Sequence, residues 1–493
     1  MADGLSTGRR LRVGVYDLYW QTLGGGEQVD GSIAEVLAHD HDVTLLGPQA
    51  PDVEATVRRL GVDLSACDYA RVVDDVEAGE ASADFDVFVN GTYLSKATNQ
   101  APVGYYYVHF PGEVPSSAER LRSRLGVAGV KALSLPPRLP QRLTEVQAAF
   151  DRRVHRVEFV PTYTRFLSNS RFTASWVERL WGRPSDVLYP PVRPSVRPAV
   201  KSPLILVLGR FFDPSKGHSK KQHELLATFG ELYRSGRLPG WRMAIVGGCD
   251  AANRDYAMAV KRAARGLPVE VHVNASGAVV ERLLGESTLY WHGAGLGEDA
   301  ERHPQRFEHF GISVVEAMAA GAVPMVFAAA GPAEIVHDGV NGLHWTSLTD
   351  LADQTEALVD DPPRTAELSR AAVDRAGDFS STAFADRLTG YLSSRETAPR
   401  IGRSSGGSMR ADGHDRLPLI RMTNINLEPR EGMSLDDIIA DTDDGLLFMS
   451  NRSWSIDDRR LNFQFGVELA REIKGCLLYT SDAADDLVSV VCW

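Results

Sequence analysis

Two glutamates, Glu308 and Glu316, have the spacing and surroundings that most clearly predict chemistry in this sequence. They lie on either side of a Phe-Gly turn in Glu-His-Phe-Gly-Ile-Ser-Val-Val-Glu, which continues into Ala-Met-Ala-Ala-Gly. Carboxylates accept paired hydrogen bonds from vicinal hydroxyl groups. Gly311, Ile312 and Ser313 would begin a helix whose free N–H groups attract anions. The segment therefore predicts a site for a ligand that carries hydroxyl groups and phosphate.

Two cations, Arg210 and Lys216, follow an apolar strand in Gly-Arg-Phe-Phe-Asp-Pro-Ser-Lys-Gly. A diphosphate leaving group gains negative charge as its bond breaks, so fixed cations stabilise the transition state more than the ground state. The alternative interpretation is a pair of solvated loop cations. The basic insertion that follows, His-Ser-Lys-Lys-Gln-His at 218–223, has no role that the sequence assigns.

The first half of the chain contributes a glycine loop and a histidine. Gly24, Gly25, Gly26 and Glu27 lie between a first strand and a first helix, where glycine lets a ligand approach the backbone. His109 follows a later strand, at the edge where α/β sheets bind ligands. Taken alone, the loop could be a simple strand-to-helix turn, and a lone histidine is more often structural.

Together, these segments resemble the retaining GT-B glycosyltransferases, most closely glycosyltransferase family 4, over residues 10–395. The resemblance implies that Glu308 binds the donor sugar and Glu316 the ribose. It places Arg210 and Lys216 at the diphosphate. His109 would stand beside the reacting sugar, where it orients the sugar or stabilises the developing cation.

The same resemblance implies positions for the remaining site residues. The backbone at Gly311, Ile312 and Ser313 would face the donor diphosphate, and the loop that begins at Gly24 would face the donor phosphate and the acceptor. His309 departs from the pattern, since many relatives carry glycine there, and this indicates a subgroup of the family.

The implied reaction transfers a hexose of mannose or glucose type from a GDP- or UDP-sugar to a hydroxyl group. The acceptor would be a glycan, a lipid-linked acceptor or a small molecule, and the departing phosphate would take its proton. Tyr-Tyr-Val-His-Phe-Pro and Glu-His-Phe-Gly resemble mannosyltransferases that use GDP-mannose, with UDP-sugars left open. No Asp-x-Asp triplet lies in a plausible metal loop, so no metal or other cofactor is expected. The alternative is a non-catalytic protein that binds nucleotide or sugar on the same scaffold.

Short apolar strands that alternate with helical patterns predict an α/β fold of two Rossmann-like domains that face each other across a cleft. A proline-rich stretch separates the two series, because five prolines cannot continue a helix or a central strand. The predicted divisions are an acceptor domain at 1–190, a linker at 191–203, a nucleotide-sugar domain at 204–378, a crossover helix at 379–395, a linker at 396–413, a partial β-rich fragment at 414–475 and a tail at 476–493.

Composition narrows the class of protein. The net charge of −12 argues against a nucleic-acid binder. Four scattered cysteines, no signal-peptide core and no apolar run of roughly 18 residues predict a cytoplasmic protein. The segment 116–157 carries nine Arg or Lys residues among apolar ones, which suits peripheral contact with an anionic membrane. A solvated basic hairpin is the alternative.

The C-terminal region has a different character. Residues 407–475 resemble the C-terminal domain of the TldD/PmbA metalloprotease family, although that family's His-Glu-x-x-x-His helix is absent. Residues 476–493 resemble a translated sequencing adapter. We therefore expect a chimeric chain in which a protease remnant has no chemistry of its own and function is settled before residue 400. An Asp-Gly turn within 441–454 predicts antiparallel strands.

Overall fold

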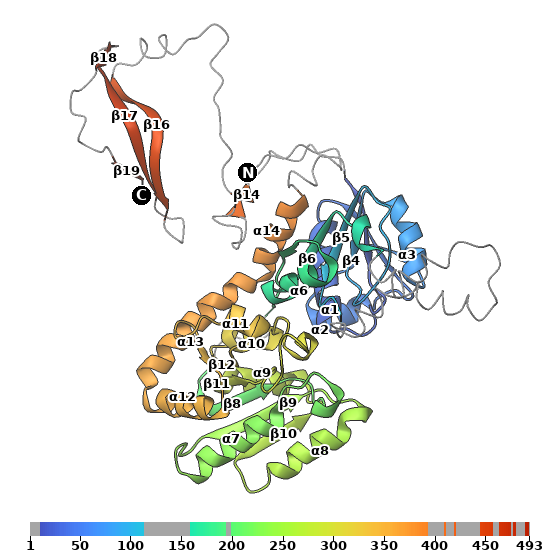
Figure 1. The fold of residues 1–493 in the computed structure, drawn as a ribbon, viewed down its shortest axis with the longest axis vertical. Helices are drawn as coiled ribbons and strands as arrows, with labels where there is room; N and C mark the ends of the chain where they lie inside the picture. Colours follow the sequence, from blue (N-terminus) through green and yellow to red (C-terminus); the bar gives the residue numbers. More distant parts are fainter. Residues whose placement is uncertain are drawn as a thin grey trace, which may run out of the picture. The chain divides into compact units, whose positions relative to one another are not determined.

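The computed structural model describes residues 10–112, 158–193 and 199–392, together with short strands of the C-terminal region. The chain divides into two compact units, residues 1–421 and 422–493 (Figure 1). Within the first unit, the first domain covers the described residues up to 193. The second domain follows from residue 199.

A seven-stranded parallel sheet with the strand order β3-β2-β1-β4-β5-β6-β7 forms the first domain. The strands are β1 (Arg12–Tyr16), β2 (Asp42–Gly47), β3 (Asp68–Arg71), β4 (Val87–Asn90), β5 (Val103–Val108), β6 (Arg165–Ser168) and β7 (Ser185–Val187). The helices are α1 (Gly25–Ala38), α2 (Val53–Leu60), α3 (Asp75–Ala81) and α6 (Arg171–Trp181). One apolar core lies on each face of this sheet.

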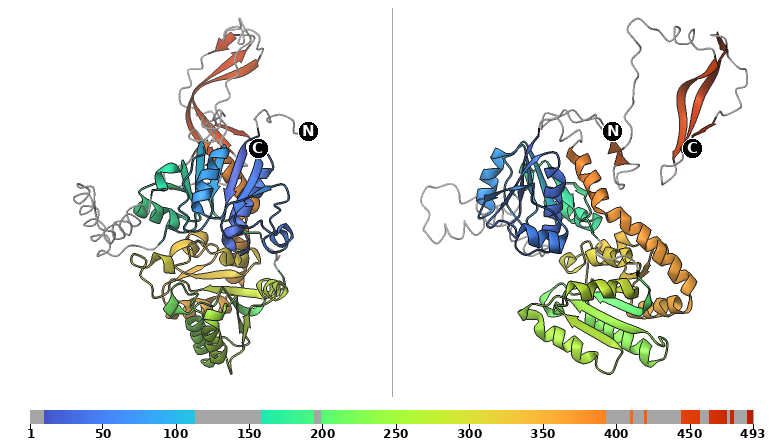
Figure 2. Two further views of the ribbon diagram at one scale, coloured as in Figure 1. Left: turned by 90° about the vertical axis from the view of Figure 1, so that its right-hand side faces the viewer. Right: turned by 180° about the vertical axis from the view of Figure 1, so that it is seen from behind.

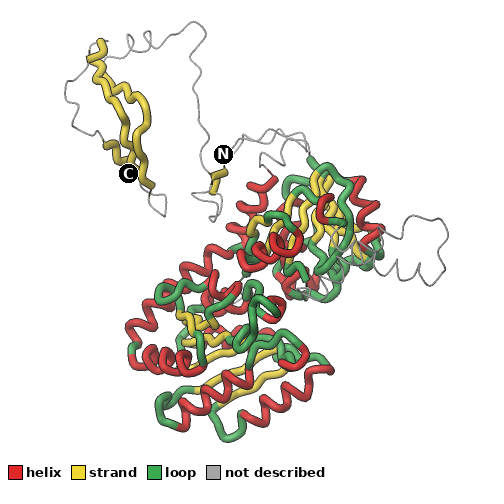
Figure 3. Tube along the Cα trace, viewed as in Figure 1, coloured by secondary structure: helices red, strands yellow, loops and turns green. Residues whose placement is uncertain are grey.

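A six-stranded parallel sheet with the order β10-β9-β8-β11-β12-β13 forms the second domain. Its strands are β8 (Ser202–Leu208), β9 (Arg242–Gly247), β10 (Val269–Val273), β11 (Ser287–His292), β12 (Val323–Phe327) and β13 (Leu343–Trp345). Helices cover both faces (Figure 3). They are α7 (Gln222–Arg234), α8 (Arg254–Ala263), α9 (Gly277–Glu286), α10 (Ile312–Ala319), α11 (Ala330–Ile335), α12 (Leu348–Asp360) and α13 (Pro362–Ala376). The two helix-covered parallel sheets confirm the predicted fold class.

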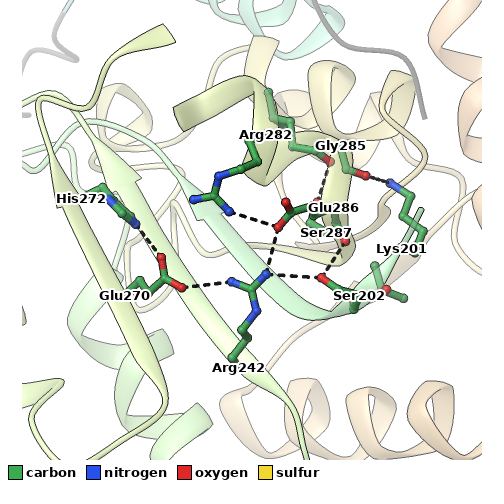
Figure 4. Close-up of polar contacts among 11 residues, drawn as sticks. Lys201, Ser202, Arg242, Glu270, His272, Arg282, Gly285, Glu286 and Ser287 are labelled. Carbon is green, nitrogen blue, oxygen red and sulfur yellow. Dashed lines mark hydrogen bonds and ion pairs between the residues drawn. The ribbon is translucent and has the colours of Figure 1, made fainter. Parts of the chain in front are cut away.

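A polar network ties together the start of the second sheet (Figure 4). Arg242, at the first position of β9, donates to Glu270 at 3.1 Å and to Glu286 at 3.0 Å. Arg282 reaches the same Glu286 carboxylate at 3.1 Å from one turn earlier in α9. The network therefore lies at the end of the sheet opposite to the carboxyl ends of the strands.

The last described helix of the first unit, α14 (Ser381–Leu392), packs on the first domain although the second domain precedes it in sequence (Figure 2). Phe384 and Leu388 join the core around α1. Tyr391 donates a hydrogen bond to the carbonyl of Val187, and its own carbonyl accepts one from Tyr105, each at 3.1 Å. This helix therefore connects the two domains a second time.

The described part of the C-terminal region consists of β-strands. β14 (Met409–Arg410) pairs with β15 (Leu419–Ile420). In the second unit, β17 (Phe463–Lys474) pairs antiparallel with β16 (Asp444–Ile456), β18 (Leu477–Tyr479) and β19 (Ser489–Cys492). Antiparallel pairing was predicted correctly, but the predicted Asp-Gly turn was wrong. Asp444 and Gly445 lie inside β16, paired with Lys474 and Ile473.

The basic segment 116–157 lies outside the described residues. None of the helices in the described ranges combines the length and the apolar character that crossing a bilayer requires.

Candidate active site

A cavity of about 520 Å³ lies between the two domains, where the carboxyl ends of several strands meet. Parallel α/β sheets bind ligands at this edge because the loops that follow the strands converge there. From the first domain it is lined by Gly25, Val29, His109, Asn169 and Pro190; from the second domain it is lined by Leu208, Gly209, Arg210, Lys220, Gly247, Gly248, Val280, Glu308, His309, Phe310, Gly311, Ile312, Ser313 and Glu316.

Glu308 is the centre of a buried polar cluster in this cleft. Its Oε2 forms an ion pair with Lys220 and accepts a hydrogen bond from Nε2 of His292 at 3.2 Å. The side chains of Glu308 and Lys220 are 18% and 15% exposed, and that of His292 is 2% exposed. Burial drives the pKa of His292 well below its usual value, so this ring is neutral. Its Nε2–H group then donates the hydrogen bond to the Glu308 carboxylate. His292 therefore orients the Glu308 carboxylate.

Lys220 occupies a desolvated position beside that carboxylate. Burial lowers the pKa of its amine to about 8. A side chain at Gly209 would meet the Lys220 stem, since a Cβ there would lie 2.7 Å from Lys220 Cγ. Because Gly209, directly after β8, has no side chain, the Lys220 side chain can pass over it into the cleft.

The basic insertion at 218–223, which the sequence left without a role, supports this loop. Lys221 adopts a positive φ of 57° just before α7, and its amine pairs with Glu298 at 2.9 Å. Gln222 donates to the carbonyl of Arg210 at 3.0 Å. The insertion therefore supplies one lysine to the cleft, one to a buried ion pair and an amide that holds the Arg210 backbone.

The structure describes the side chain of only one of the two predicted cations, Arg210 and Lys216. Arg210 lines the cleft, with its guanidinium 5.1 Å from the centre of the Phe212 ring. Lys216 ends a short 3₁₀ helix, η4 (Pro214–Lys216). Its side chain lies outside the described residues, so its role stays a prediction. Sequence reasoning missed Lys220, and the signal that could have found it was the Lys-Lys pair in the unexplained insertion.

The start of α10 faces the cleft as an open helix N-terminus. Gly311 precedes the helix with φ of 112°, which favours glycine, and no side chain caps the first turn. The hydroxyl of Ser313 accepts a hydrogen bond from buried Tyr290 at 2.9 Å. Uncapped N–H groups and the helix dipole suit a phosphate. Further along the same helix, burial raises the pKa of Glu316 to about 7.

His109 stands on the opposite wall, in the first domain. Its Nε2 lies 3.0 Å from the carbonyl oxygen of Gly91. Since a carbonyl only accepts, Nε2 carries the proton, and burial lowers the pKa so that the ring is neutral. Nδ1 is then an acceptor for a ligand hydroxyl. Asn169 fixes the histidine backbone by donating to its carbonyl at 2.9 Å.

The glycine loop divides between two cavities. Gly25 lines the cleft, and a Cβ there would lie 3.1 Å from Ile312, so this position brings the first domain close to the start of α10. Gly26 and Glu27 line a second cavity of about 210 Å³ inside the first domain. Gly24 lines neither cavity; its N–H donates to the Glu27 carboxylate at 2.5 Å.

His309, the residue that departs from the family pattern, forms a contact between the domains. Its ring stacks on Phe110 of the first domain, with centroids 4.1 Å apart and planes 7° from parallel. Phe172 stacks on it at 6.3 Å. Burial lowers the pKa of His309 to about 3, so the ring packs as a neutral aromatic group.

A second contact between the domains involves Glu334 of α11, whose carboxylate accepts hydrogen bonds from two backbone N–H groups at the start of α6, those of Arg171 at 2.8 Å and Phe172 at 2.6 Å. A carboxylate at a helix N-terminus is a favourable arrangement.

Parts of the chain are similar to known proteins. Residues 191–375 match the family model described as "Glycosyl transferases group 1". A GDP-Man:Man(3)GlcNAc(2)-PP-Dol alpha-1,2-mannosyltransferase from Dictyostelium discoideum is 28% identical over 244 residues, which are 45% of this chain and 46% of that protein. The chain thus spans less than half the length of this curated relative.

A solved structure shares the fold of the first unit. The structure of HepE from Anabaena in complex with UDP aligns over 78% of this chain and 99% of its own, with a TM-score of 0.55 and 15% identity. At this level of identity the likeness concerns the fold alone.

A second family model overlaps the first match over residues 314–375 and extends into the C-terminal region. Residues 314–478 match the model described as "PmbA/TldA metallopeptidase C-terminal domain". A metalloprotease from Methanothermobacter thermautotrophicus is 28% identical over 147 residues, 28% of this chain and 30% of that protein. The first unit therefore has the GT-B fold, its residues 191–375 are similar to the group 1 glycosyltransferases, and residues 314–478 are similar to the PmbA/TldA C-terminal domain.

Proposed function

We propose that this chain is a retaining glycosyltransferase that transfers a hexose of mannose or glucose type from a nucleotide diphosphate sugar to an acceptor hydroxyl group. The acceptor is a glycan, a lipid-linked acceptor or a small molecule. The observation that carries the proposal is the interdomain cleft, in which Glu308, Lys220, Arg210 and the open start of α10 all line one cavity.

The donor would bind mainly to the second domain. Its diphosphate would lie at the N-terminus of α10, between Arg210 and Lys220. Glu316, four residues into the same helix, would accept hydrogen bonds from the ribose hydroxyl groups. Glu308, held by His292 and Lys220, would accept them from the sugar.

Catalysis in this proposal is electrostatic. As the bond between the sugar and the diphosphate breaks, negative charge grows on the leaving phosphate, and Arg210 and Lys220 stabilise that charge in a water-poor cleft. The departing phosphate takes the proton from the acceptor hydroxyl on the same face of the sugar. Neutral His109 accepts a hydrogen bond from the sugar through Nδ1 and orients it.

We propose that no metal ion takes part. The two cations supply the positive charge that a divalent ion would otherwise bring to a diphosphate. Among the described residues, no group of three or more His, Cys, Asp or Glu side chains is arranged to hold a metal ion.

Two nucleotide classes, GDP-sugars and UDP-sugars, are the candidate donors. The name of the Dictyostelium relative includes GDP-Man, and the HepE complex contains UDP. Thermal unfolding of the full chain with a panel of GDP- and UDP-sugars tests the proposal, because a ligand that binds the folded state raises its melting temperature. We expect one nucleotide class to raise it. No shift with any member of the panel would contradict the proposal.

A non-catalytic protein that binds nucleotide or sugar would give the same thermal shift. The two candidates differ in turnover: only the enzyme releases nucleotide diphosphate from the donor in the presence of an acceptor. The buried Lys220–Glu308–His292 cluster favours the enzyme. A carboxylate that is held in one orientation by two partners is typical of a group that stabilises a transition state.

A further inference from the structure

Two residues that line opposite walls of the cleft, His109 and Glu308, are each followed directly in sequence by an aromatic ring, and these two rings stack on each other. Phe110 and His309 lie face to face, with centroids 4.1 Å apart and planes 7° from parallel. The Phe110 side chain is 2% exposed, so the stack is closed to solvent on that side. Because one peptide bond joins each ring to its neighbour in the cleft, the stack limits how far His109 and Glu308 can move relative to each other.

A second connection between the same two residues runs through helices α11 and α6. The carbonyl of Glu308 accepts a hydrogen bond from the N–H of Gly331 in α11, at 3.0 Å. Three residues further along α11, the Glu334 carboxylate accepts hydrogen bonds from the first two N–H groups of α6, at 2.8 and 2.6 Å. Asn169, two residues before α6, donates to the carbonyl of His109 at 2.9 Å. These hydrogen bonds and the short stretches of chain between them therefore link Glu308 to His109 a second time.

The residues of this second connection are themselves held in place. A Cβ at Gly331 would lie 2.4 Å from the carbonyl oxygen of His309, so α11 can approach this segment only because residue 331 is glycine. The hydroxyl of Tyr189 donates to the Glu334 carboxylate at 3.3 Å, and Arg375 donates to the Glu334 carbonyl at 3.1 Å. The second connection is therefore fixed by close packing at one end and by further hydrogen bonds at the other.

Sugar transfer depends on the distance between His109 and Glu308 more than donor binding does. In the proposed reaction, Glu308 binds the donor sugar and His109 orients that sugar from the opposite domain. A misplacement of about 1 Å in a reacting geometry costs up to roughly 100-fold in rate. The groups proposed for the diphosphate and the ribose all belong to the second domain, so the donor keeps most of its contacts if the domains shift. A contact that fixes one wall against the other would therefore act on the rate.

We propose that the Phe110–His309 stack and the contact between Glu334 and α6 are positioning elements of the reaction, which hold His109 of the first domain in register with Glu308 of the second. Phe110, His309 and Glu334 act through the residues that they hold in place. This inference rests on the proposed glycosyltransferase function and adds positioning residues to it. Loss of either connection should lower turnover while donor affinity is kept.

The test measures kcat and donor affinity of the full chain. Nucleotide release, with methyl α-mannoside and methyl α-glucoside offered as acceptors, gives kcat, and calorimetric titration with the same GDP- or UDP-sugar gives the donor Kd. Phe110→Ala, His309→Ala and Glu334→Ala should each lower kcat by about 10- to 100-fold and leave the donor Kd within about threefold of wild type. The double variant of Phe110 and His309 should be no slower than the slower single variant, because both changes break the same stack.

His309→Phe separates the stack from the chemistry of the imidazole. Phenylalanine keeps a flat ring against Phe110 and removes Nε2, which has no hydrogen-bond partner among the residues that the structure describes. We therefore expect this variant to fold and to turn over within about threefold of wild type. Tyr233→Ala is the matched control, because it breaks the stack of Phe229 and Tyr233 in the last turn of α7, and it should leave kcat unchanged.

The outcomes separate failure of this inference from failure of the proposed function. An unchanged kcat in both Phe110→Ala and His309→Ala would overturn the positioning role and leave the glycosyltransferase function standing. A loss in His309→Phe as large as that in His309→Ala, or a similar loss in Tyr233→Ala, would also overturn it. Wild type that neither binds nor turns over any nucleotide sugar would overturn the proposed function, and the positioning role with it.

Discussion

At the scale of single residues, the site depends on how Glu308 is held. A carboxylate that is 18% exposed and paired with a lysine and a neutral histidine has little freedom to rotate. Such preorganisation lets a group act on the transition state without first being reoriented. Because Lys220 and His292 meet at the same carboxylate oxygen, loss of either partner removes one of the two contacts that hold the Glu308 carboxylate in place.

The first prediction at this scale concerns the contribution of Lys220 to the rate of sugar transfer. We expect Lys220→Ala to lower the rate of sugar transfer by roughly 100- to 1,000-fold, the usual cost of removing one preorganised group that stabilises developing charge. Lys261→Ala, which changes an exposed lysine of α8, is the control and should change the rate less than about threefold. Steady-state assays of nucleotide release check both variants. A rate of sugar transfer in Lys220→Ala equal to that in Lys261→Ala would contradict the role of Lys220.

The pH dependence of donor binding is the second prediction at this scale. Glu316, with a pKa of about 7, must be ionised to accept hydrogen bonds from the ribose, and Lys220, with a pKa of about 8, must be protonated to attract the diphosphate. Donor affinity should therefore peak between pH 7 and 8 and fall roughly fivefold between pH 7 and 6. Calorimetric titration of the donor at several pH values measures this profile. Glu316→Gln should remove the acid limb and leave the alkaline limb, and a flat wild-type profile would contradict the assignment.

The same raised pKa has the opposite effect on folding. The pKa of Glu316 is about 7 in the folded chain, whereas a glutamate side chain ordinarily has a pKa of 4.5. Between these two pH values the Glu316 carboxyl group is largely neutral in the folded chain. The folded state therefore holds a proton that the unfolded state has already released. The contribution of Glu316 to the free energy of unfolding is present at acid pH and is lost as pH rises through 7.

Much of the site could be predicted from residue types and spacing. Glu308, Glu316, Arg210 and His109 all line the cleft to which they were predicted to belong. Lys220 could not be singled out, because its position depends on the fold of an irregular loop and on the space above Gly209. His292 carries no local signal either, since its partner Glu308 lies 16 residues further along the chain.

At the scale of elements, strand ends and helix starts position the chemistry. β8 ends just before the loop that carries Arg210, β9 ends at Gly247, and α10 begins at the cleft. The long apolar strands could be predicted because parallel strands are buried on both faces. β3 could not, since its four residues Asp-Tyr-Ala-Arg are exposed and lack an apolar run. The predicted turn at Asp444–Gly445 was wrong because pairing with β17 extends through it.

The Arg242 network gives the prediction at this scale. Because Arg242 joins β9 to β10 and to the end of α9, Arg242→Ala should lower the free energy of unfolding by about 1–2 kcal/mol. Arg282→Ala, which loses only a pair within one helix, should lower it by about 0.3–0.5 kcal/mol. Urea unfolding followed by circular dichroism measures both. Donor binding should be unchanged in each variant, since the network lies at the far end of the sheet. Equal losses in the two variants would show that the network does not act as a unit.

At the scale of the whole molecule, the domains of the first unit are held together by contacts that no local pattern specifies. His309 stacks on Phe110 across the cleft, and Glu334 binds the start of α6. The sequence indicated that His309 was unusual, but its role depends on a partner about 200 residues away. The two-domain fold was predictable from the alternation of strands and helices, whereas the contacts that fix the cleft were not.

The C-terminal unit should be dispensable for the proposed function. Residues 422–493 form a separate compact unit that contains antiparallel strands. We expect a protein ending at residue 398 to keep the melting temperature of the first unit within about 2 °C, which corresponds to about 1 kcal/mol or less. It should also keep the thermal shift with nucleotide sugar. Scanning calorimetry of the full and shortened chains tests this. Loss of donor binding on truncation would mean that the C-terminal region takes part in the site.

The most direct measurement of the central claim compares donor turnover by wild type and by Glu308→Gln, which keeps the shape of the side chain and removes its charge. With the nucleotide sugar that stabilises the fold, wild type should release nucleotide diphosphate and form a glycoside that retains the anomeric configuration of the donor. Glu308→Gln should bind the donor within about threefold of wild type but transfer roughly 100-fold more slowly. Equal turnover by the two proteins, or a product of inverted configuration, would contradict the account.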